Sequence, residues 1–138
     1  MPEVIPLVGQ RRFLIYLIES AGPNMRVVLF KNNVDVDHST EWVTLEEADF
    51  SGYERQEIAW GTPYLAGFGY ASVDAESVHF IHDGGPVENV IYGYAILDTY
   101  SNTVLYGDNF DPPALMSEYT DSVDVTPLLN LADAWDWF

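Results

Sequence analysis

Short apolar runs recur along this chain, and turn-forming residues such as Gly, Pro, Asn and Asp separate them. Runs of this length with such boundaries are typical of β-strands. We therefore expect strands at 13–18, 25–30, 53–60, 64–70, 78–81, 89–98, 103–106 and 122–125. Strands at this spacing with no long helix between them predict an all-β fold. The predicted architecture is an antiparallel, jelly-roll-like β-sandwich of about seven or eight short strands.

The first predicted hairpin spans residues 13–30. The run from Phe13 to Ile18 is apolar on both faces, as expected of a fully buried strand. Residues 21–24 then form an Ala-Gly-Pro-Asn turn signal. Met25 to Phe30 is predicted to return beside the first strand.

Asn89 to Asp98 is the strongest predicted strand because its side chains fall into two faces. One face holds Val90, Tyr92, Tyr94 and Ile96, and the other holds Ile91, Gly93, Ala95 and Leu97. The strand at 103–106 is its expected hairpin partner across a turn at 99–102. Residues 111–113, Asp-Pro-Pro, cannot belong to a central strand, since proline has no amide hydrogen to donate.

Helical structure is predicted in two places. Residues 44–47, Thr-Leu-Glu-Glu, match a capping box and predict one short helical turn near residues 44–48. Apolar residues at 128, 131, 132 and 135 have helical spacing near the end of the chain. We expect one β-sandwich domain over residues 1–138, with an N-terminal arm at 1–12 and a C-terminal aromatic tail at 128–138.

The charge balance narrows the possible partners. Five basic residues face 22 acidic ones, the net charge is −17, and no Lys or Arg follows Arg55. Binding to nucleic acid or anionic lipid needs cations, so we expect neither nucleic acid nor membrane as a partner. The longest apolar run, six residues at 13–18, is far shorter than a membrane span. The Arg11–Arg12 pair follows the first apolar residues, which is the wrong order for a secretory signal.

Metal sites are poorly supported by the sequence. The chain has no Cys, which excludes disulfides and Cys-based zinc sites. Asp35 and Asp37, with neighbouring acids, offer oxygen ligands for Ca²⁺ or Mg²⁺, but their spacing departs from the EF-hand pattern. His79 and His82 are three residues apart on a predicted strand and therefore point to opposite faces. We predict no metal site and no cofactor.

Catalytic motifs are equally scarce. The sequence contains no Gly-x-Ser-x-Gly, no Walker loop and no Gly-x-Gly-x-x-Gly. Acidic pairs such as Glu46–Glu47, Asp108–Asp111 and Asp133–Asp136 are expected by chance in so acidic a chain. We predict a protein without catalytic residues, and a hydrolase that uses acidic side chains is a weaker alternative.

Aromatic residues suggest binding instead. A second hypothesis is a carbohydrate-binding module whose rings stack on sugars. The candidate rings are Trp42, Tyr53, Trp60, Tyr64, Phe68, Tyr70, Tyr92, Tyr94, Tyr100 and Tyr106, although core packing is the commoner use of such residues. At the end of the chain, Trp135, Trp137 and Phe138 predict an anchor for a neighbouring subunit.

Several segments in order carry a family resemblance. They are Val28-Leu-Phe-Lys-Asn-Asn33, Thr44-Leu-Glu-Glu-Ala-Asp-Phe50, Ser51-Gly-Tyr-Glu-Arg55, Val90-Ile-Tyr-Gly-Tyr-Ala-Ile-Leu97, Phe110-Asp-Pro-Pro113 and Asp124-Val-Thr-Pro127. Together they resemble the core of small structural proteins from tailed bacteriophage virions, over roughly residues 27–128.

The resemblance implies a non-enzymatic virion protein that decorates or cements a capsid, or serves as a minor capsid or tail component. Its partners would be the phage capsid or other virion subunits, and it would form a homo-oligomer, for which a trimer is the first expectation. The acidic surface favours the outside of the particle, because packaged DNA fills the inside. The partner-binding residues we expect are Arg11 and Arg12 in the arm, and Trp135, Trp137 and Phe138 in the tail.

Overall fold

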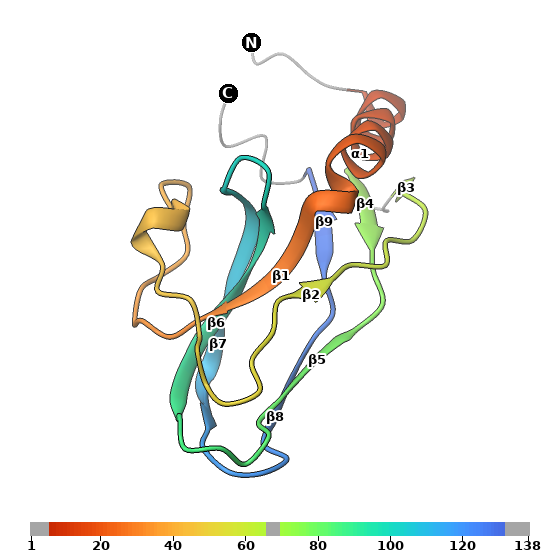
Figure 1. The fold of residues 1–138 in the computed structure, drawn as a ribbon. Helices are drawn as coiled ribbons and strands as arrows, with labels where there is room; N and C mark the ends of the chain where they lie inside the picture. The colour runs from red at the N-terminus through yellow and green to blue at the C-terminus, as the bar shows by residue number, and fades with distance from the viewer. Residues whose placement is uncertain (1–5, 66–69, 132–138) are drawn as a thin grey trace.

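Antiparallel sheets form the body of the molecule, and one helix packs at one end of it (Figure 1). The computed structural model describes residues 6–65 and 70–131. The helix is α1 (Leu7–Ala21), followed by a 3-10 turn, η1 (Gly22–Asn24), and a second 3-10 turn lies further along, η2 (Trp42–Thr44). The strands are β1 (Met25–Phe30), β2 (Gln56–Glu57), β3 (Tyr64–Leu65), β4 (Ala71–Asp74), β5 (Val78–Ile81), β6 (Asn89–Asp98), β7 (Thr103–Met116), β8 (Ser122–Val125) and β9 (Leu128–Asn130).

Every strand pairing in the described part of the chain is antiparallel. Four strands form a sheet in the order β2-β1-β6-β7, three form a sheet in the order β3-β4-β9, and β5 pairs with β8. Side chains of β1 and β6 pack against those of β5 and β8 in one core cluster. This arrangement confirms the predicted antiparallel, sandwich-like fold with mostly β structure.

Strand β1 of the four-stranded sheet is buried on both faces. Val27 and Leu29 of β1 face the β5–β8 layer, whereas Val28 and Phe30 face the opposite way. The segment between β1 and β2 covers that second face, with Leu45 buried and Trp42 half-buried against it. Five of the six residues of β1 are therefore buried, which explains why its sequence shows no alternation.

The first predicted strand is wrong, because residues 7–21 form α1. Leu14 is buried in a cluster with β4 and β9, and Leu17, Ile18 and Ala21 pack against the same cluster. The spacing from Leu14 to Ala21 is that of one helix face. A short apolar run such as 13–18 is compatible with a strand or a helix, and packing against β4 and β9 decides between them. The predicted arm at 1–12 overlaps this helix at residues 7–12.

Gln10 ties the helix to β4. Its side chain is only 2% exposed, and Oε1 accepts the amide hydrogen of Ala71 at 2.9 Å. We expect Gln10→Ala to lower the free energy of unfolding by about 2 kcal/mol, because the Ala71 amide loses its buried acceptor. Urea unfolding measures this loss. Gln56→Ala, at a half-buried position on β2, is the matched control and should stay within about 0.5 kcal/mol. Equal effects of the two substitutions would contradict the assignment.

The β6–β7 hairpin is longer and less regular than its sequence indicates. Its register shifts between Ile91 and Gly93 and again between Ile96 and Leu97. Ile91 and Tyr94 consequently pack on the same core cluster, although strict alternation places them on opposite faces. The Asp-Pro-Pro segment lies within β7, an edge strand, in the gap of the register between the Gly93–Asn109 and Ile91–Ala114 pairs. The missing amide hydrogens of its prolines therefore break no hydrogen bond between β6 and β7.

Other elements differ from expectation in extent. The helical turn predicted near 44–48 lies at Trp42–Thr44, where the Thr44 hydroxyl donates to the carbonyl of Glu41. Of the strand expected at 53–60, only Gln56–Glu57 is present. Residues 128–130 form a strand, not the start of a helix, and β4 was not predicted. Residues 132–138 of the predicted tail lie outside the described residues.

Candidate functional site

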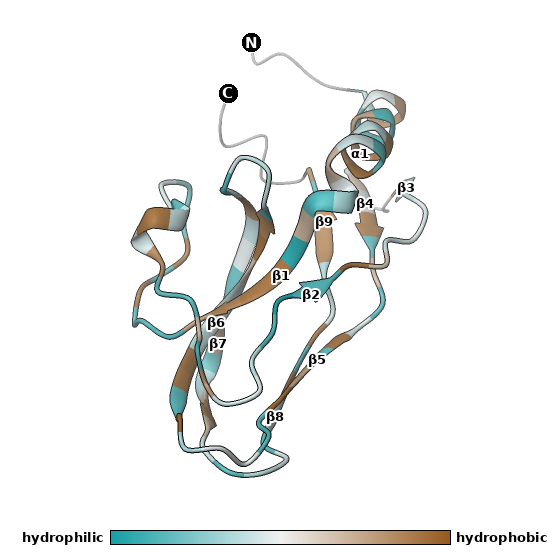
Figure 2. Cartoon of the chain, viewed as in Figure 1, coloured by the Kyte–Doolittle hydropathy of each residue, from teal (hydrophilic) through white to brown (hydrophobic). Residues whose placement is uncertain are grey.

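The outer side of α1 exposes large apolar residues. Val8 is 75% exposed, Phe13 is 56% exposed and Tyr16 is 57% exposed, although the opposite side of the helix is packed into the core. Apolar positions accordingly recur along the whole of α1 (Figure 2). We call the exposed residues Val8, Arg12, Phe13, Tyr16 and Glu19 the helix face. Large apolar side chains exposed on one side of a helix make it a candidate contact surface.

The two arginines predicted to bind a partner have different roles. Arg11 is half-buried, and its Nε donates to the carbonyl of Pro63 at 2.9 Å, which fastens α1 to the segment before β3. Arg12 is exposed, and its Cζ lies 5.7 Å from the centre of the Tyr16 ring. Only Arg12 is therefore directed to the outside, as part of the helix face.

The other cations pair with acids inside the domain. Arg26 lies 3.6 Å from Glu57, and Lys31 lies 3.0 Å from Asp49. Arg55 donates to both carboxylate oxygens of Glu47 at 2.8 Å. Among the described residues, Arg12 makes no ion pair with a carboxylate, so its charge is available to a partner.

A second group of exposed apolar residues lies at the end of the molecule opposite α1, where the loops β5–β6 and β7–β8 meet (Figure 1). We call this group the loop end: Ile81, Val87, Val90, Leu115 and Tyr119. Val90 and Leu115 are directly paired across β6 and β7. Their neighbours Ile91 and Met116 are buried in the core, so Val90 and Leu115 project from the outer face of the sheet.

Buried hydrogen bonds hold the loop end in shape. His82 is fully buried, and its Nδ1 accepts the amide hydrogen of Gly84 at 3.0 Å. The ring proton therefore belongs on Nε2, which donates to the carbonyl of Val87 at 2.9 Å. The prediction that His79 and His82 point to opposite sides is confirmed, because His79 is exposed on β5 and contacts Asp124 on β8.

The turn that carries Tyr119 is also fixed. The Oδ2 atom of Asp121 accepts amide hydrogens from Ser117 at 3.0 Å and Glu118 at 2.9 Å. These bonds hold the pKa of the Asp121 carboxyl below its ordinary value. Tyr119, 72% exposed, lies beside Gly84, whose φ of 90° suits a glycine. The loop end is therefore ordered before any partner binds.

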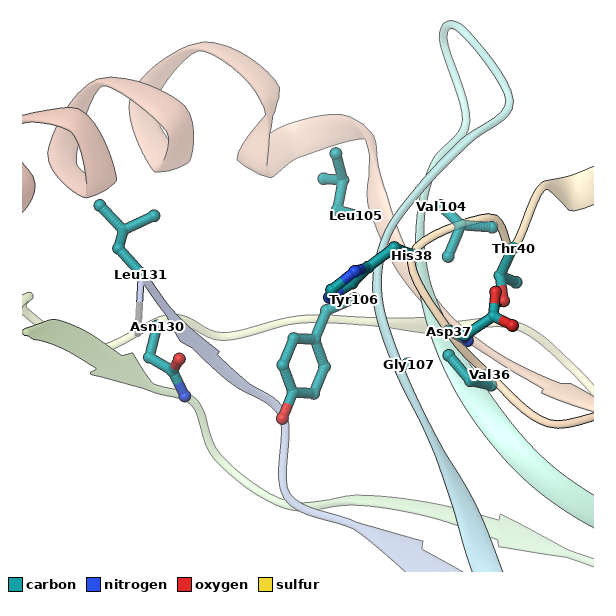
Figure 3. A pocket seen from close by; sticks show the side chains of 10 residues that line it. All are labelled: Val36, Asp37, His38, Thr40, Val104, Leu105, Tyr106, Gly107, Asn130 and Leu131. Atoms are coloured by element: carbon teal, nitrogen blue, oxygen red, sulfur yellow. The ribbon is translucent and has the colours of Figure 1, made fainter. Parts of the chain in front are cut away.

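A pocket of about 440 Å³ opens between the segment after β1, the start of β7 and the end of β9 (Figure 3). His38 and Tyr106 lie near its middle, with Asp37 and Thr40 to one side and Asn130 and Leu131 to the other. The remaining walls are mostly aliphatic, formed by Val36, Val104 and Leu105 together with Gly107. Half of the ten lining residues carry a polar side-chain group, so the pocket is neither purely apolar nor a cluster of charges.

The Asp35–Asp37 loop does not assemble a metal centre. Oδ1 of Asp37 accepts hydrogen bonds from the hydroxyl of Ser39 at 2.6 Å and from its amide at 2.8 Å. These bonds lower the pKa of the Asp37 carboxyl, and the carboxylate caps the turn. Among residues 6–65 and 70–131, no group of three or more acidic or histidine side chains could hold a metal ion.

Six of the ten aromatic residues proposed for sugar binding are divided among three core clusters, whereas Tyr64 and Tyr100 are exposed. Tyr53 and Tyr94 pack against the β5–β8 layer, and Trp60 and Tyr106 pack against the cluster under α1. Trp42 and Tyr92 pack against the third cluster, and the Arg55 guanidinium lies 5.5 Å from the Trp42 ring. They do not form one continuous ring-lined face. Phe68, Trp135, Trp137 and Phe138 lie outside the described residues.

Comparison of the chain with protein-family models, with curated proteins and with solved structures found no match. The resemblance to small virion proteins therefore stays a prediction. None of the helices in the described ranges has the length and apolar character needed to cross a bilayer.

Proposed function

We propose that this protein is a non-enzymatic structural subunit of a tailed-bacteriophage virion, which decorates or cements the capsid or serves as a minor capsid or tail component. The observation that carries the proposal is the exposure of large apolar side chains at opposite ends of one small, very acidic domain. Two separated contact surfaces allow a subunit to join one neighbour at each end. The assignment to a phage particle rests on the six segments whose order along the chain resembles that of small virion proteins.

The charge distribution supports a place on the outside of the particle. At a net charge of −17, the chain is repelled by packaged DNA, and four of its five cations bond within the domain. The loop end suits contact with a shell, because its hydrogen bonds hold the exposed side chains in place and reduce the entropy lost on binding. Trp135, Trp137 and Phe138 add a third candidate contact from the tail.

Binding to the shell tests this proposal. Purified particles of the phage that encodes the chain should contain it in many copies by mass spectrometry. The protein added to undecorated shells should bind, and Leu115→Asp or Tyr119→Asp should weaken that binding roughly tenfold or more. Deletion of residues 135–138 should weaken it as well.

Tyr100→Asp is the matched control, because Tyr100 is 88% exposed in the turn between β6 and β7, away from the loop end. Circular dichroism confirms that each variant is folded. Absence of the protein from particles, together with no binding of the wild type to shells, would refute the virion role. Equal affinities of the wild type and the Leu115 and Tyr119 variants would instead refute the loop end as the contact.

A further inference from the structure

We propose that the helix face is a two-fold interface, on which α1 of a second copy of this chain packs in the antiparallel direction. The inference stands on the helix itself and does not depend on the role in a virion. An interface of this type is isologous, so the same residues must complement one another across the two-fold axis. The arrangement of apolar and charged residues on α1 meets that requirement.

The apolar part of the helix face lies between two opposite charges. Arg12 and Glu19 are seven residues apart, or about two turns, and therefore lie on the same side of α1. Tyr16 lies between them with its ring half-exposed, and Val8 extends the apolar strip toward the start of the helix. Neither Arg12 nor Glu19 has an ion pair within the described residues, so both charges are open to a partner.

Antiparallel packing brings these charges together twice. Arg12 and Glu19 are equally distant, about 5 Å along the axis, from a point between Ile15 and Tyr16. A two-fold axis at that point places each Arg12 opposite the Glu19 of the other copy and brings the two Tyr16 rings together. A parallel pair would place Arg12 opposite Arg12 and Glu19 opposite Glu19, which like-charge repulsion disfavours.

The overall charge also points to this surface for self-association. Two copies with a net charge of −17 each repel one another over most of their surfaces. The helix α1 carries two arginines and one glutamate, so approach through it avoids the acidic remainder. A partner with a purely acidic surface would suit Arg12 but would oppose Glu19, and a second copy satisfies both.

The size of the surface sets the expected strength. A helix of 15 residues is about 22 Å long and roughly 10 Å wide, so its outer face covers about 220 Å². This area is well below the roughly 800 Å² per partner of a standard stable interface. We therefore expect a weak dimer that forms as the protein concentration rises. Attachment to a common surface would favour the dimer further, because it raises the local concentration.

Charge-reversal variants of the full chain test the inference by sedimentation equilibrium over a wide concentration range. The wild type should show a monomer–dimer equilibrium. Arg12→Glu and Glu19→Arg should each raise the dimer dissociation constant roughly tenfold or more. An equimolar mixture of the two variants should dimerise again, since each pair across the axis is then complementary. Tyr16→Ser should weaken the dimer without any change in charge.

Lys31→Glu and Glu54→Arg are the matched controls, because they change the net charge by the same amounts at exposed or half-exposed positions away from α1. Both should dimerise like the wild type. A wild type that stays monomeric at every concentration overturns the inference, as does a trimer. A mixture of Arg12→Glu and Glu19→Arg that remains as weak as either variant alone also overturns it. Failure of the wild type to bind shells affects only the proposed virion role.

Discussion

Gly93→Ala is expected to lower the free energy of unfolding by about 3 kcal/mol or more, because the hairpin has no room for one additional methyl group. A Cβ atom at Gly93 would collide with the carbonyl oxygen of Asp108 and with the ring of Phe30. The first obstacle is backbone of the paired strand β7, and the second is a fully buried ring. Neither can move without disturbing the four-stranded sheet.

Chemical denaturation of both proteins measures the loss. Gly22→Ala is the matched control, because a Cβ at Gly22 meets its nearest atom, in Ile18, at an ordinary 3.6 Å, and the backbone there is already helical. That control should be neutral or stabilising by about 0.4–1 kcal/mol. A Gly93→Ala protein as stable as the control would show that β6 and β7 do not approach as closely as described.

Loss of stability above pH 10 is the second large effect that we expect. Burial, followed by the hydrogen bond to Glu47, raises the pKa of Tyr53, and burial, followed by the nearby Tyr106 and Asp108, raises the pKa of Tyr94. In the unfolded chain both phenols ionise near their ordinary pKa of about 10. At a pH between the unfolded-state pKa and the folded-state pKa of either tyrosine, unfolding releases a proton. The stability that each protonated phenol contributes is therefore complete below about pH 10 and falls above it.

Each such tyrosine lowers the free energy of unfolding by about 1.4 kcal/mol for every pH unit above its unfolded pKa. Urea unfolding at a series of alkaline pH values measures the slope. Tyr94→Phe should reduce the slope by less than half, because the Tyr94 phenol is more exposed than that of Tyr53, whereas Tyr100→Phe, at an exposed position, should leave it unchanged. An unchanged slope in the Tyr94→Phe protein would contradict the raised pKa of the half-buried Tyr94 phenol.

The Tyr53 hydroxyl belongs to a network that joins three segments. It donates to Glu47 at 2.7 Å and accepts the amide hydrogen of Leu29 at 3.2 Å, while Arg55 binds the same carboxylate. The bidentate pair raises the pKa of Arg55. The Thr-Leu-Glu-Glu segment, which looks like a helix start in the sequence, thus provides a carboxylate that fastens the segment after β1 to the sheet.

The two exposed apolar surfaces could be predicted from the sequence only in part. The scarcity of basic residues drew attention to Arg12, but its neighbours on the helix face were hidden by the interpretation of 13–18 as a strand. The spacing of Gln10, Leu14, Leu17 and Ala21 was the signal for a helix. The loop end carried no sequence signal, because an exposed Leu115 and a buried Met116 look alike until the strands are paired.

By itself, the sequence determined the features that depend on neighbouring residues. Turn signals and apolar runs were enough to place the strands at 25–30, 78–81, 89–98 and 122–125, and proline chemistry was enough to exclude a central strand at 111–113. Only the tertiary structure decided that residues 7–21 form a helix, where the β6–β7 register shifts, and which apolar residues stay exposed. Those outcomes depend on contacts between segments far apart in the chain. At these positions the packing and burial of apolar side chains outweigh the intrinsic secondary-structure propensity of the residues.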